Sequence, residues 1–315
     1  MFLFAIRCTH DCSLIHSNAK CDRFLIGFGD GPNFKQGLTT AMDYGNAKKA
    51  HYCLEHLFRI CHLNMELSFK HQLSLVCVIL LLPALCSSQD SFTDSRATYY
   101  GSPDCYGNPR GACGFGEYGR TVNDGSVAGV SRLWRNGSGC GACYQVRCKI
   151  QQYCDENGAY VVVTDYGEGD RTDFVMSPRG YSRLGRNADA SAELFKYGVV
   201  DVEYRRVPCR YSGYNILYKV HEHSKNPDYF AVVILFVDGT YDVNAVQMWQ
   251  EDCQEWKPMR RAFGAVFDYS NPPNGEIYLR FQVSGSGGLY WVQSKNAIPS
   301  DWRAGVAYDT QLQLN

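Results

Sequence analysis

The sequence predicts an all-β protein made of two domains that follow each other along the chain. Three observations support this fold class. Short apolar or aromatic runs alternate with glycine-rich turns, only one segment has a helical pattern, and the composition combines 45% hydrophobic with 20% charged residues and abundant Gly and Tyr. The length of 315 residues has room for two domains and a processed segment.

Residues 65–88 are predicted to be a secretory signal peptide. Lys70 lies in a weakly cationic start, the apolar run 73–85 follows, and small residues ending at Ser88 precede a polar segment. Such a run is too short to cross about 30 Å of hydrocarbon. A buried core helix is the alternative, but Pro83 interrupts the run. We therefore expect cleavage after Ser88, secretion, and no membrane contact of the mature chain.

Residues 1–64 are interpreted as a doubtful upstream extension, because Met65 begins the secretory pattern. An alternative transcript or a wrong start codon accounts for such a segment, and we exclude it from the fold. Its potential zinc ligands do not have the spacing of a standard zinc finger, so we expect no metal site. They are Cys53, His56, Cys61 and His62.

In the first half of the mature chain, three apolar or aromatic runs are expected to be strands, 144–147, 160–164 and 199–204. The helical pattern covers residues 188–197. Asp189 and Ser191 are candidates for capping this helix, and Gly198 is placed to end it.

The second half is predicted to be a β-sandwich of about 100 residues. Its expected strands are 215–220, 230–237, 278–283 and 305–314. Asp238-Gly239 and Asn274-Gly275 are typical of hairpin turns.

Eight cysteines follow the predicted signal peptide. An even number in an oxidising compartment predicts disulfides. Cys140 and Cys143 also form a Cys-x-x-Cys pair, but no second pair is spaced for zinc, and secretion argues against cytosolic redox chemistry. The eight are Cys105, Cys113, Cys140, Cys143, Cys148, Cys154, Cys209 and Cys253.

Net charge and a glycosylation sequon indicate which kinds of partner and environment to expect. The formal net charge of −1 provides no basic field for nucleic acid, so neutral partners are favoured. Asn136 begins an Asn-Gly-Ser sequon, which predicts an exposed glycosylation site.

Five segments between Ala97 and Cys209 resemble, in order, the landmarks of the first domain of the expansin family, and the second half resembles its pollen-allergen-like domain. The resemblance covers residues 97–315 and implies a double-psi β-barrel at 97–211, related to family-45 glucanases, and an immunoglobulin-like, cellulose-binding β-sandwich at 215–315. The segments are 97–101, 111–116, 140–148, 163–165 and 204–209, then 256–259, 263–267 and 301–302.

The resemblance also implies three disulfides, Cys113 with Cys140, Cys143 with Cys209, and Cys148 with Cys154. Cys105 and Cys253 have no counterpart in that scheme. The family's wall-loosening members carry a His-Phe-Asp motif whose Asp their activity needs. Here Val175 stands at that position. Loss of this motif is what marks the expansin-like proteins, and the Gly-Asp-Arg-Thr-Asp-Phe stretch at 169–174 resembles the expansin-like B group.

An open groove lined by Thr98, Tyr100, Asp165 and Phe174 is expected to hold a glucan by hydrogen bonds and ring stacking. Hydrolysis is the alternative, because inverting glycosidases use two carboxylates. Asp165 supplies one, and Asp173 is the candidate for the second, since Val175 cannot transfer a proton. The other interpretation of Asp173 is a solvated acidic loop.

Aromatic side chains on the sandwich are candidates for stacking on pyranose rings. Tyr229, Trp256 and Phe263 are the predicted polysaccharide-binding residues. Adjacent Phe230 faces the opposite way from Tyr229 on a strand, and Phe267 and Trp302 are expected to be buried.

Together these observations predict a monomeric, secreted cell-wall protein of plants that needs no cofactor and binds cellulose, xyloglucan or a related glucan. The resemblance implies non-enzymatic wall loosening. Two alternatives stay open, a weak glycoside hydrolase and a wall or stress protein that only binds glucan.

Overall fold

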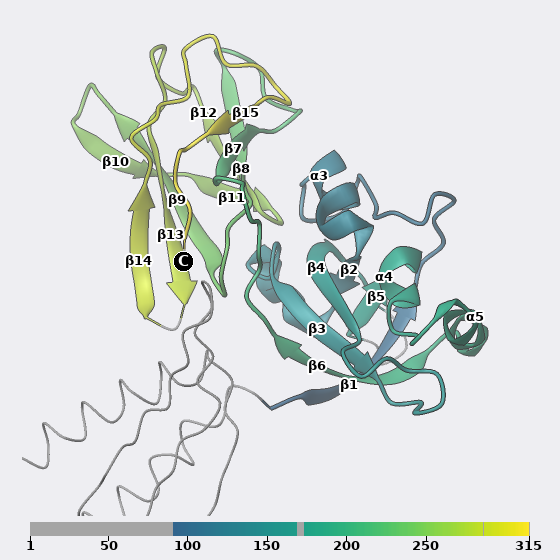
Figure 1. Ribbon diagram of the computed structural model, residues 1–315. Helices are drawn as coiled ribbons and strands as arrows, with labels where there is room; N and C mark the ends of the chain where they lie inside the picture. The colour runs from purple at the N-terminus through teal and green to yellow at the C-terminus, as the bar shows by residue number, and fades with distance from the viewer. Residues whose placement is uncertain (1–90, 169–172, 286, 315) are drawn as a thin grey trace, which may run out of the picture. The chain divides into compact units, whose positions relative to one another are not determined.

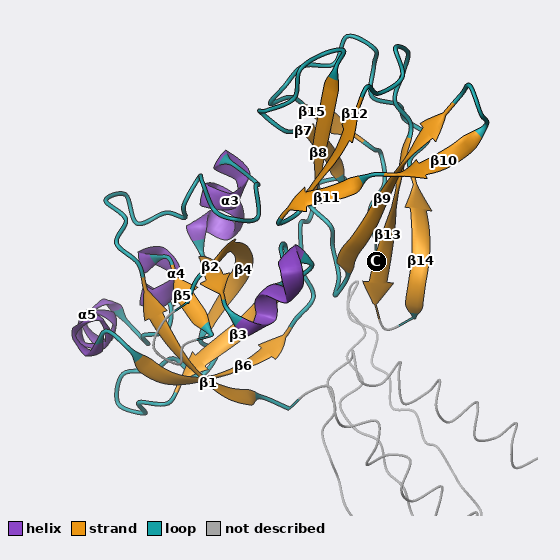
Figure 2. Ribbon diagram, turned by 180° about the vertical axis from the view of Figure 1, so that it is seen from behind, coloured by secondary structure: helices purple, strands orange, loops and turns teal. Residues whose placement is uncertain are grey.

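The computed structural model describes residues 91–168, 173–285 and 287–314, and these belong to one compact unit, Ser88–Asn315 (Figure 1). The predicted signal peptide, 65–88, and the extension, 1–64, lie outside the described residues. Strands outnumber helices and form two separate β structures (Figure 2). Of the helices in the described ranges, none is long and apolar enough to cross a bilayer.

The first β structure is a closed barrel of strands in the order β1-β5-β2-β4-β3-β6. Two pairs, β1 with β5 and β2 with β4, are parallel, and the others are antiparallel. Closure removes the unpaired edges of the sheet. The strands are β1 (Thr93–Tyr99), β2 (Val127–Val130), β3 (Cys143–Cys148), β4 (Ala159–Tyr166), β5 (Phe174–Met176) and β6 (Val200–Arg206).

Alternation along the strands fills the barrel with apolar side chains. All three runs that the sequence assigns to strands in this half lie within or overlap β3, β4 and β6. The sequence pattern did not predict strands β1, β2 and β5. Strands β2 and β5 are too short to show alternation, and β1 begins with polar residues. Fully buried core residues include Ala97, Val130, Val146, Val163, Phe174 and Val202.

Short helices connect the barrel strands, and α5 occupies the range that the sequence predicts. Its N-cap is Asn187, whose side chain accepts a hydrogen bond from Ala190 N at 2.8 Å. The predicted caps, Asp189 and Ser191, are therefore wrong, because both lie inside the helix, beyond the extended residue that a cap requires. The helices are α3 (Glu117–Thr121), α4 (Pro178–Ser182), α5 (Ala188–Tyr197) and the 3₁₀ segments η2 (Val122–Gly125) and η3 (Arg132–Gly137).

The second β structure is a sandwich of a four-stranded sheet, β10-β9-β13-β14, and a five-stranded sheet, β11-β12-β8-β7-β15. Fully buried aromatic and aliphatic residues such as Tyr218, Phe230, Met248 and Phe281 form its core. The strands are β7 (Leu217–Val220), β8 (Tyr229–Leu235), β9 (Asp242–Gln250), β10 (Glu255–Pro258), β11 (Arg260–Phe263), β12 (Val266–Ser270), β13 (Leu279–Gly285), β14 (Gly288–Gln293) and β15 (Ala307–Asp309).

The two dipeptides predicted to form hairpins do not do so. Asp238-Gly239 separates β8 from β9, and Asn274-Gly275 separates β12 from β13, and in each case the two strands belong to different sheets. The chain does turn at the first of these dipeptides, where Gly239 has a positive φ of 83°. The sequence shows where a chain reverses, but sheet membership depends on which partners compete for each strand.

Between residues 91 and 314, the described part of the chain contains three disulfides, Cys113–Cys140, Cys143–Cys209 and Cys148–Cys154. These are the pairs that the resemblance implies. Cys105 and Cys253 are unpaired and exposed.

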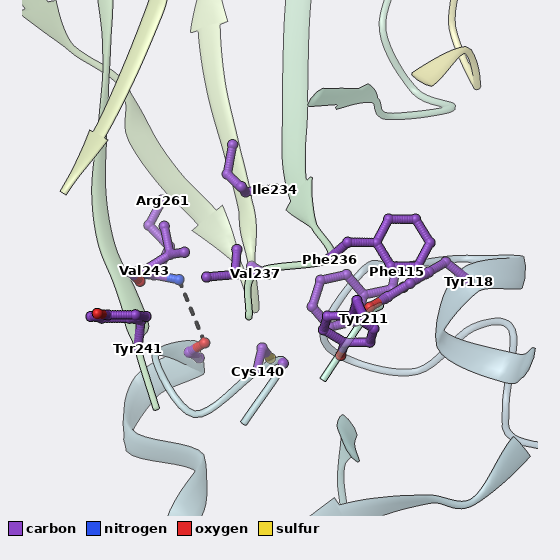
Figure 3. A pocket seen from close by; sticks show the side chains of 13 residues that line it. Phe115, Tyr118, Cys140, Tyr211, Ile234, Phe236, Val237, Tyr241, Val243 and Arg261 are labelled. Carbon is purple, nitrogen blue, oxygen red and sulfur yellow. Dashed lines mark hydrogen bonds between the residues drawn. The ribbon is translucent and has the colours of Figure 1, made fainter. Parts of the chain in front are cut away.

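Within this compact unit, barrel loops contact the sandwich (Figure 3). Ala265 N donates to Cys113 O at 3.0 Å, and Arg261 Nη1 donates to Gly137 O at 3.5 Å. Aromatic rings pack edge to face beside these bonds, with Tyr118 and Phe236 centroids 4.9 Å apart. Hydrogen bonds therefore hold the loop that follows β1 and the end of η3 against β11 and the turn before β12, and ring packing holds α3 against the residue that follows β8.

Candidate functional site

One row of residues crosses four neighbouring barrel strands. Asp165 on β4 is in register with Gly129 on β2, Gly129 with Val175 on β5, and Val175 with Thr98 on β1. A register shift between Ala128 and Gly129 brings Asp165 into this row. The topology thus places side chains far apart in the sequence along one line.

A cleft of about 420 Å³ opens over this row. Gly129 forms part of its floor, where an added Cβ would come within 3.2 Å of Gly167 N. A larger side chain there would require the backbone to shift. The lining residues are Tyr100, Gly101, Ser102, Pro103, Gly107, Asn108, Pro109, Gly129, Asp165, Tyr166, Gly167 and Val175.

Asp165 is held in place by the loop that precedes α3. One carboxylate oxygen accepts from Ala112 N at 2.6 Å and from Tyr166 N at 2.8 Å, and the other accepts from Asn108 Nδ2 at 3.1 Å. Burial raises the pKa of this carboxyl, although the bonds from Ala112 and Asn108 act in the opposite direction. It therefore keeps its proton to a higher pH than an exposed Asp.

Aromatic side chains border the same cleft. Tyr100 is partly buried, and burial together with the charge of Asp165 raises the pKa of its phenol, which stays a hydrogen-bond donor. Tyr166 is 42% exposed, and its ring lies 5.5 Å from that of Trp134, centroid to centroid. Its hydroxyl donates to Glu168. Tyr166 and Trp134 thus extend an accessible aromatic surface from the edge of the cleft.

Thr98 lies in the row but does not line the cleft. Its Oγ1 donates to Gly198 O at 2.8 Å, which satisfies a carbonyl at the end of α5. Phe174 is fully buried in the barrel core against Tyr144 and Tyr204. Of the predicted groove residues, Tyr100 and Asp165 come together, whereas Thr98 has a capping bond and Phe174 a core position.

Asp173 is neither a cleft residue nor a member of a solvated loop, so both sequence interpretations are wrong. Its side chain is 4% exposed, and it accepts from Arg132 Nε at 2.6 Å, Arg132 Nη2 at 2.5 Å and Ser95 Oγ at 2.5 Å. Burial alone would raise the pKa of this carboxyl, but the bonds from Arg132 and Ser95 and the charge of Arg132 outweigh it and lower the pKa. The residue is a structural anchor for β1 and η3.

We expect Asp173→Asn to lower the free energy of unfolding by about 2 kcal/mol, because it removes charge-assisted hydrogen bonds from a buried site. The carboxyl has a lower pKa in the folded than in the unfolded state, where it is about 3.9, so this stability is present above that value and is lost as pH falls through the folded pKa. Denaturant titrations between pH 7 and pH 2 measure both effects.

Asp104→Asn is the matched control for this prediction, since Asp104 is exposed although it pairs with Arg120 at 2.6 Å. An exposed pair contributes little. Equal stability losses in the two variants would contradict the anchoring role of Asp173.

The row provides one carboxylate where hydrolysis requires two. Val175 is two strands away from Asp165, a separation of about 10 Å between backbones at about 4.8 Å per strand. That is close to the spacing of an acid and a base in inverting glycosidases, but Val175 cannot transfer protons. In the described ranges no cluster of three or more His, Cys, Asp or Glu could hold a metal ion. The cleft can bind hydroxyl groups through Asp165, Tyr100 and Asn108.

Two of the predicted polysaccharide-binding residues lie on the five-stranded sheet. Tyr229 on β8 donates its hydroxyl to Asp268 Oδ2 at 2.8 Å. Phe263 on β11 is 44% exposed. An added Cβ at Gly114 would lie 2.9 Å from the Phe263 ring, so the loop that holds Asp165 also contacts Phe263.

Trp256 does not join this pair, because β10 belongs to the four-stranded sheet on the other side of the sandwich core. Trp256 thus lies on a different surface from Tyr229 and Phe263, and polysaccharide binding by each of the three stays a prediction. A short aromatic run in the sequence does not show to which sheet its strand belongs. The expected burial of Phe267 and Trp302 is confirmed, at 2% and 3% exposure, and Phe230 is also buried.

Sequence reasoning missed Asn108, Tyr166 and Trp134. Tyr166 directly follows Asp165 and could have been considered for that reason. Asn108 is brought to the cleft by a loop without regular structure, for which the sequence contains no periodic pattern. Asn136, the predicted glycosylation site, is exposed in η3, and its occupancy stays a prediction.

Two family models match the chain. One, described as lytic transglycolase, covers residues 126–204, and the expansin C-terminal domain covers residues 216–299. Expansin-like B1 of Arabidopsis thaliana is 60% identical over 238 residues, which is 75% of this chain and 94% of that relative. Expansin-like B1 of Oryza sativa subsp. japonica is 38% identical over 248 residues, 78% of this chain and 97% of that relative.

Two solved structures have a similar fold. The apo form of a Clavibacter michiganensis expansin superposes with a TM-score of 0.52 at 18% identity, covering 71% of this chain and 98% of that chain. A mutant of the same expansin, solved in complex with cellohexaose, has a TM-score of 0.52 at 17% identity. These similarities and the closed barrel confirm the predicted double-psi β-barrel followed by a β-sandwich.

Proposed function

This chain belongs to the expansin family, and from that membership we propose that it is a secreted cell-wall protein that binds cellulose or a related glucan without cleaving it. The observation that carries the proposal is the row across the barrel, in which Asp165 lines a cleft and Val175, two strands away, provides no second carboxylate. The predicted signal peptide supports secretion.

Binding needs only groups that the cleft has. Asp165 and Asn108 offer hydrogen-bonding atoms to sugar hydroxyls, and Tyr100 and Tyr166 offer rings to the apolar faces of pyranoses. A bacterial expansin with the same fold was solved with cellohexaose, which supports a β-linked glucan as ligand.

The sandwich contributes a second contact to the same ligand. The loop 107–116 donates Ala112 N to Asp165 and touches Phe263 through Gly114. Phe263 and Tyr229 therefore prolong the binding surface beyond the cleft onto the five-stranded sheet. A glucan longer than the cleft would gain affinity from both parts.

Hydrolysis would need a second carboxylate beside Asp165. Asp173 is the candidate from the sequence, but its side chain is buried and bonded to Arg132 and Ser95. Val175 also stands at the position of the Asp in the family's His-Phe-Asp motif, according to the resemblance. Both observations support binding without bond cleavage.

We expect Asp165→Asn to weaken binding to cellulose about tenfold, which corresponds to about 1.4 kcal/mol. The amide has one oxygen in place of two, so it can no longer accept from both Ala112 and Asn108 while facing the ligand. Depletion of the purified protein by microcrystalline cellulose measures affinity, and a reducing-sugar assay on the same samples measures cleavage.

Asp104→Asn is the control, because Asp104 lies in the same loop, between the lining residues Pro103 and Gly107, but does not itself line the cleft. Release of reducing ends by the wild type would refute binding without cleavage. The same samples, applied to heat-inactivated walls at acid pH, separate two versions of the proposal. Extension that Asp165→Asn abolishes would add non-enzymatic loosening, and retained binding without extension would make this a binding-only wall protein.

A further inference from the structure

The outer face of the four-stranded sheet presents three tryptophans, Trp249, Trp256 and Trp291. Val246 and Met248 on β9 are buried in the core. Side chains alternate between faces along a strand, so Trp249 points outward. Trp256 on β10 is its direct cross-strand partner and shares that face. Trp291 on β14 is 36% exposed and directly opposite Gln282 on β13.

Arg280 on β13 connects these indoles. Its Cζ is 4.6 Å from the ring centroid of Trp256 and 4.8 Å from that of Trp291. Trp249 and Trp256 have centroids 5.4 Å apart. We call Trp249, Trp256, Trp291 and Arg280 the tryptophan face. Aromatic and guanidinium planes thus form one continuous surface across all four strands.

The polar groups around the tryptophan face are mainly amides. Arg280 Nε donates to Gln247 Oε1 at 2.7 Å, and register places Gln282 and Gln293 on the same side. Trp249 Nε1 donates to the carboxylate of Glu251 at 2.8 Å. Within the described ranges Arg280 makes no ion pair, so its terminal nitrogens keep hydrogens to donate.

This chemistry fits a neutral sugar polymer. Flat rings stack on the apolar faces of pyranoses, while amides and a guanidinium bond to hydroxyl groups. The cation Arg280 and the carboxylate of Glu251, which accepts from Trp249, have opposite charges, so the face has no basic field to select a polyanion. An uncharged glycan is therefore the occupant that the charges and rings of this face favour.

We propose that the tryptophan face is a second polysaccharide-binding surface, which takes a neutral β-linked glucan chain. This inference rests on the proposed function. Tyr229 and Phe263 belong to the other sheet of the sandwich, with the core between the two. A glucan bound to the tryptophan face is then a different chain from the one at the cleft, and one protein molecule bridges two chains.

Bridging can be measured apart from binding. Wild-type protein at low occupancy is expected to flocculate a suspension of cellulose nanocrystals, observed by light scattering. We expect Trp249→Ala combined with Trp291→Ala to bind nanocrystals but to need at least tenfold more protein for flocculation. Phe263→Ala should weaken the first surface and leave binding through the tryptophan face. Adding Phe263→Ala to the double replacement should weaken binding further and leave only the contacts of the cleft around Asp165.

Three further variants keep the test valid if the double replacement does not fold. Trp291→Ala alone removes an exposed ring from edge strand β14, and Trp291→Phe keeps a ring there and should restore bridging. Near-UV circular dichroism confirms folding of each variant. Arg280→Gln should raise the protein concentration required for flocculation without removing the indoles.

Each outcome decides between the two proposals. No binding of the wild type to any neutral glucan would overturn the proposed function. Binding and flocculation that match the wild type in the Trp249 and Trp291 variants would overturn only the second surface. Sedimentation velocity without glucan tests for self-association. A dimer of the wild type that is lost in these variants would make the tryptophan face an interface between copies and would overturn the proposal. Preferential binding to polygalacturonate would also overturn a neutral ligand.

Discussion

Replacing Cys143 and Cys209 together by alanine is expected to lower the free energy of unfolding by about 4 kcal/mol. The bridge joins residues 66 apart in the sequence and ties β3 to the segment that follows β6. A cross-link mainly restricts the unfolded chain, and the restriction grows with the loop that it closes. Guanidinium titrations under non-oxidising, non-reducing conditions, followed by near-UV circular dichroism, measure the loss.

The matched control is the pair Cys148 and Cys154, which are only 6 residues apart. The same relation gives a loss of about 2 kcal/mol for this smaller loop. If the control lost more free energy of unfolding than the Cys143 and Cys209 variant, loop closure would not be the main source of the stabilisation. Local packing around the shorter bridge would then be the main source.

Phe174→Ala is expected to lower the free energy of unfolding by about 3–5 kcal/mol, because it leaves a cavity in the barrel. The ring is fully buried, with centroids 5.1 Å from Tyr204 and 5.7 Å from Tyr144. Phe174 lies directly before Val175, so its packing also fixes β5 beneath the cleft. Urea titration of the variant against the wild type measures the change.

Phe263→Ala is the matched control, since it makes the same chemical change at a side chain that is 44% exposed. We expect less than about 1 kcal/mol of lost stability there, but about tenfold weaker binding to cellulose. The two variants should thus show opposite profiles, one unstable and the other stable but weak in binding. Equal stability losses would mean that Phe263 is packed as a core residue.

The fold class could be predicted from the sequence alone, as could the position of the longest helix among the described residues, 188–197. Strand runs 144–147 and 160–164 could be predicted because apolar alternation is local and reflects burial of one face. The family motifs also pointed to Asp165 and to the three disulfides that the structure forms. These features are encoded within short segments or in ordered motifs.

Which side chains share a surface became clear from the three-dimensional structure. It aligned Asp165, Gly129 and Val175 in one row, paired Asp173 with Arg132, and separated Trp256 from Phe263 on opposite sheets. These outcomes depend on strand register and sheet membership, which result from competition among distant partners for the same backbone hydrogen bonds. A local pattern shows that a strand exists, but its neighbours and the direction of its faces are set by the whole core.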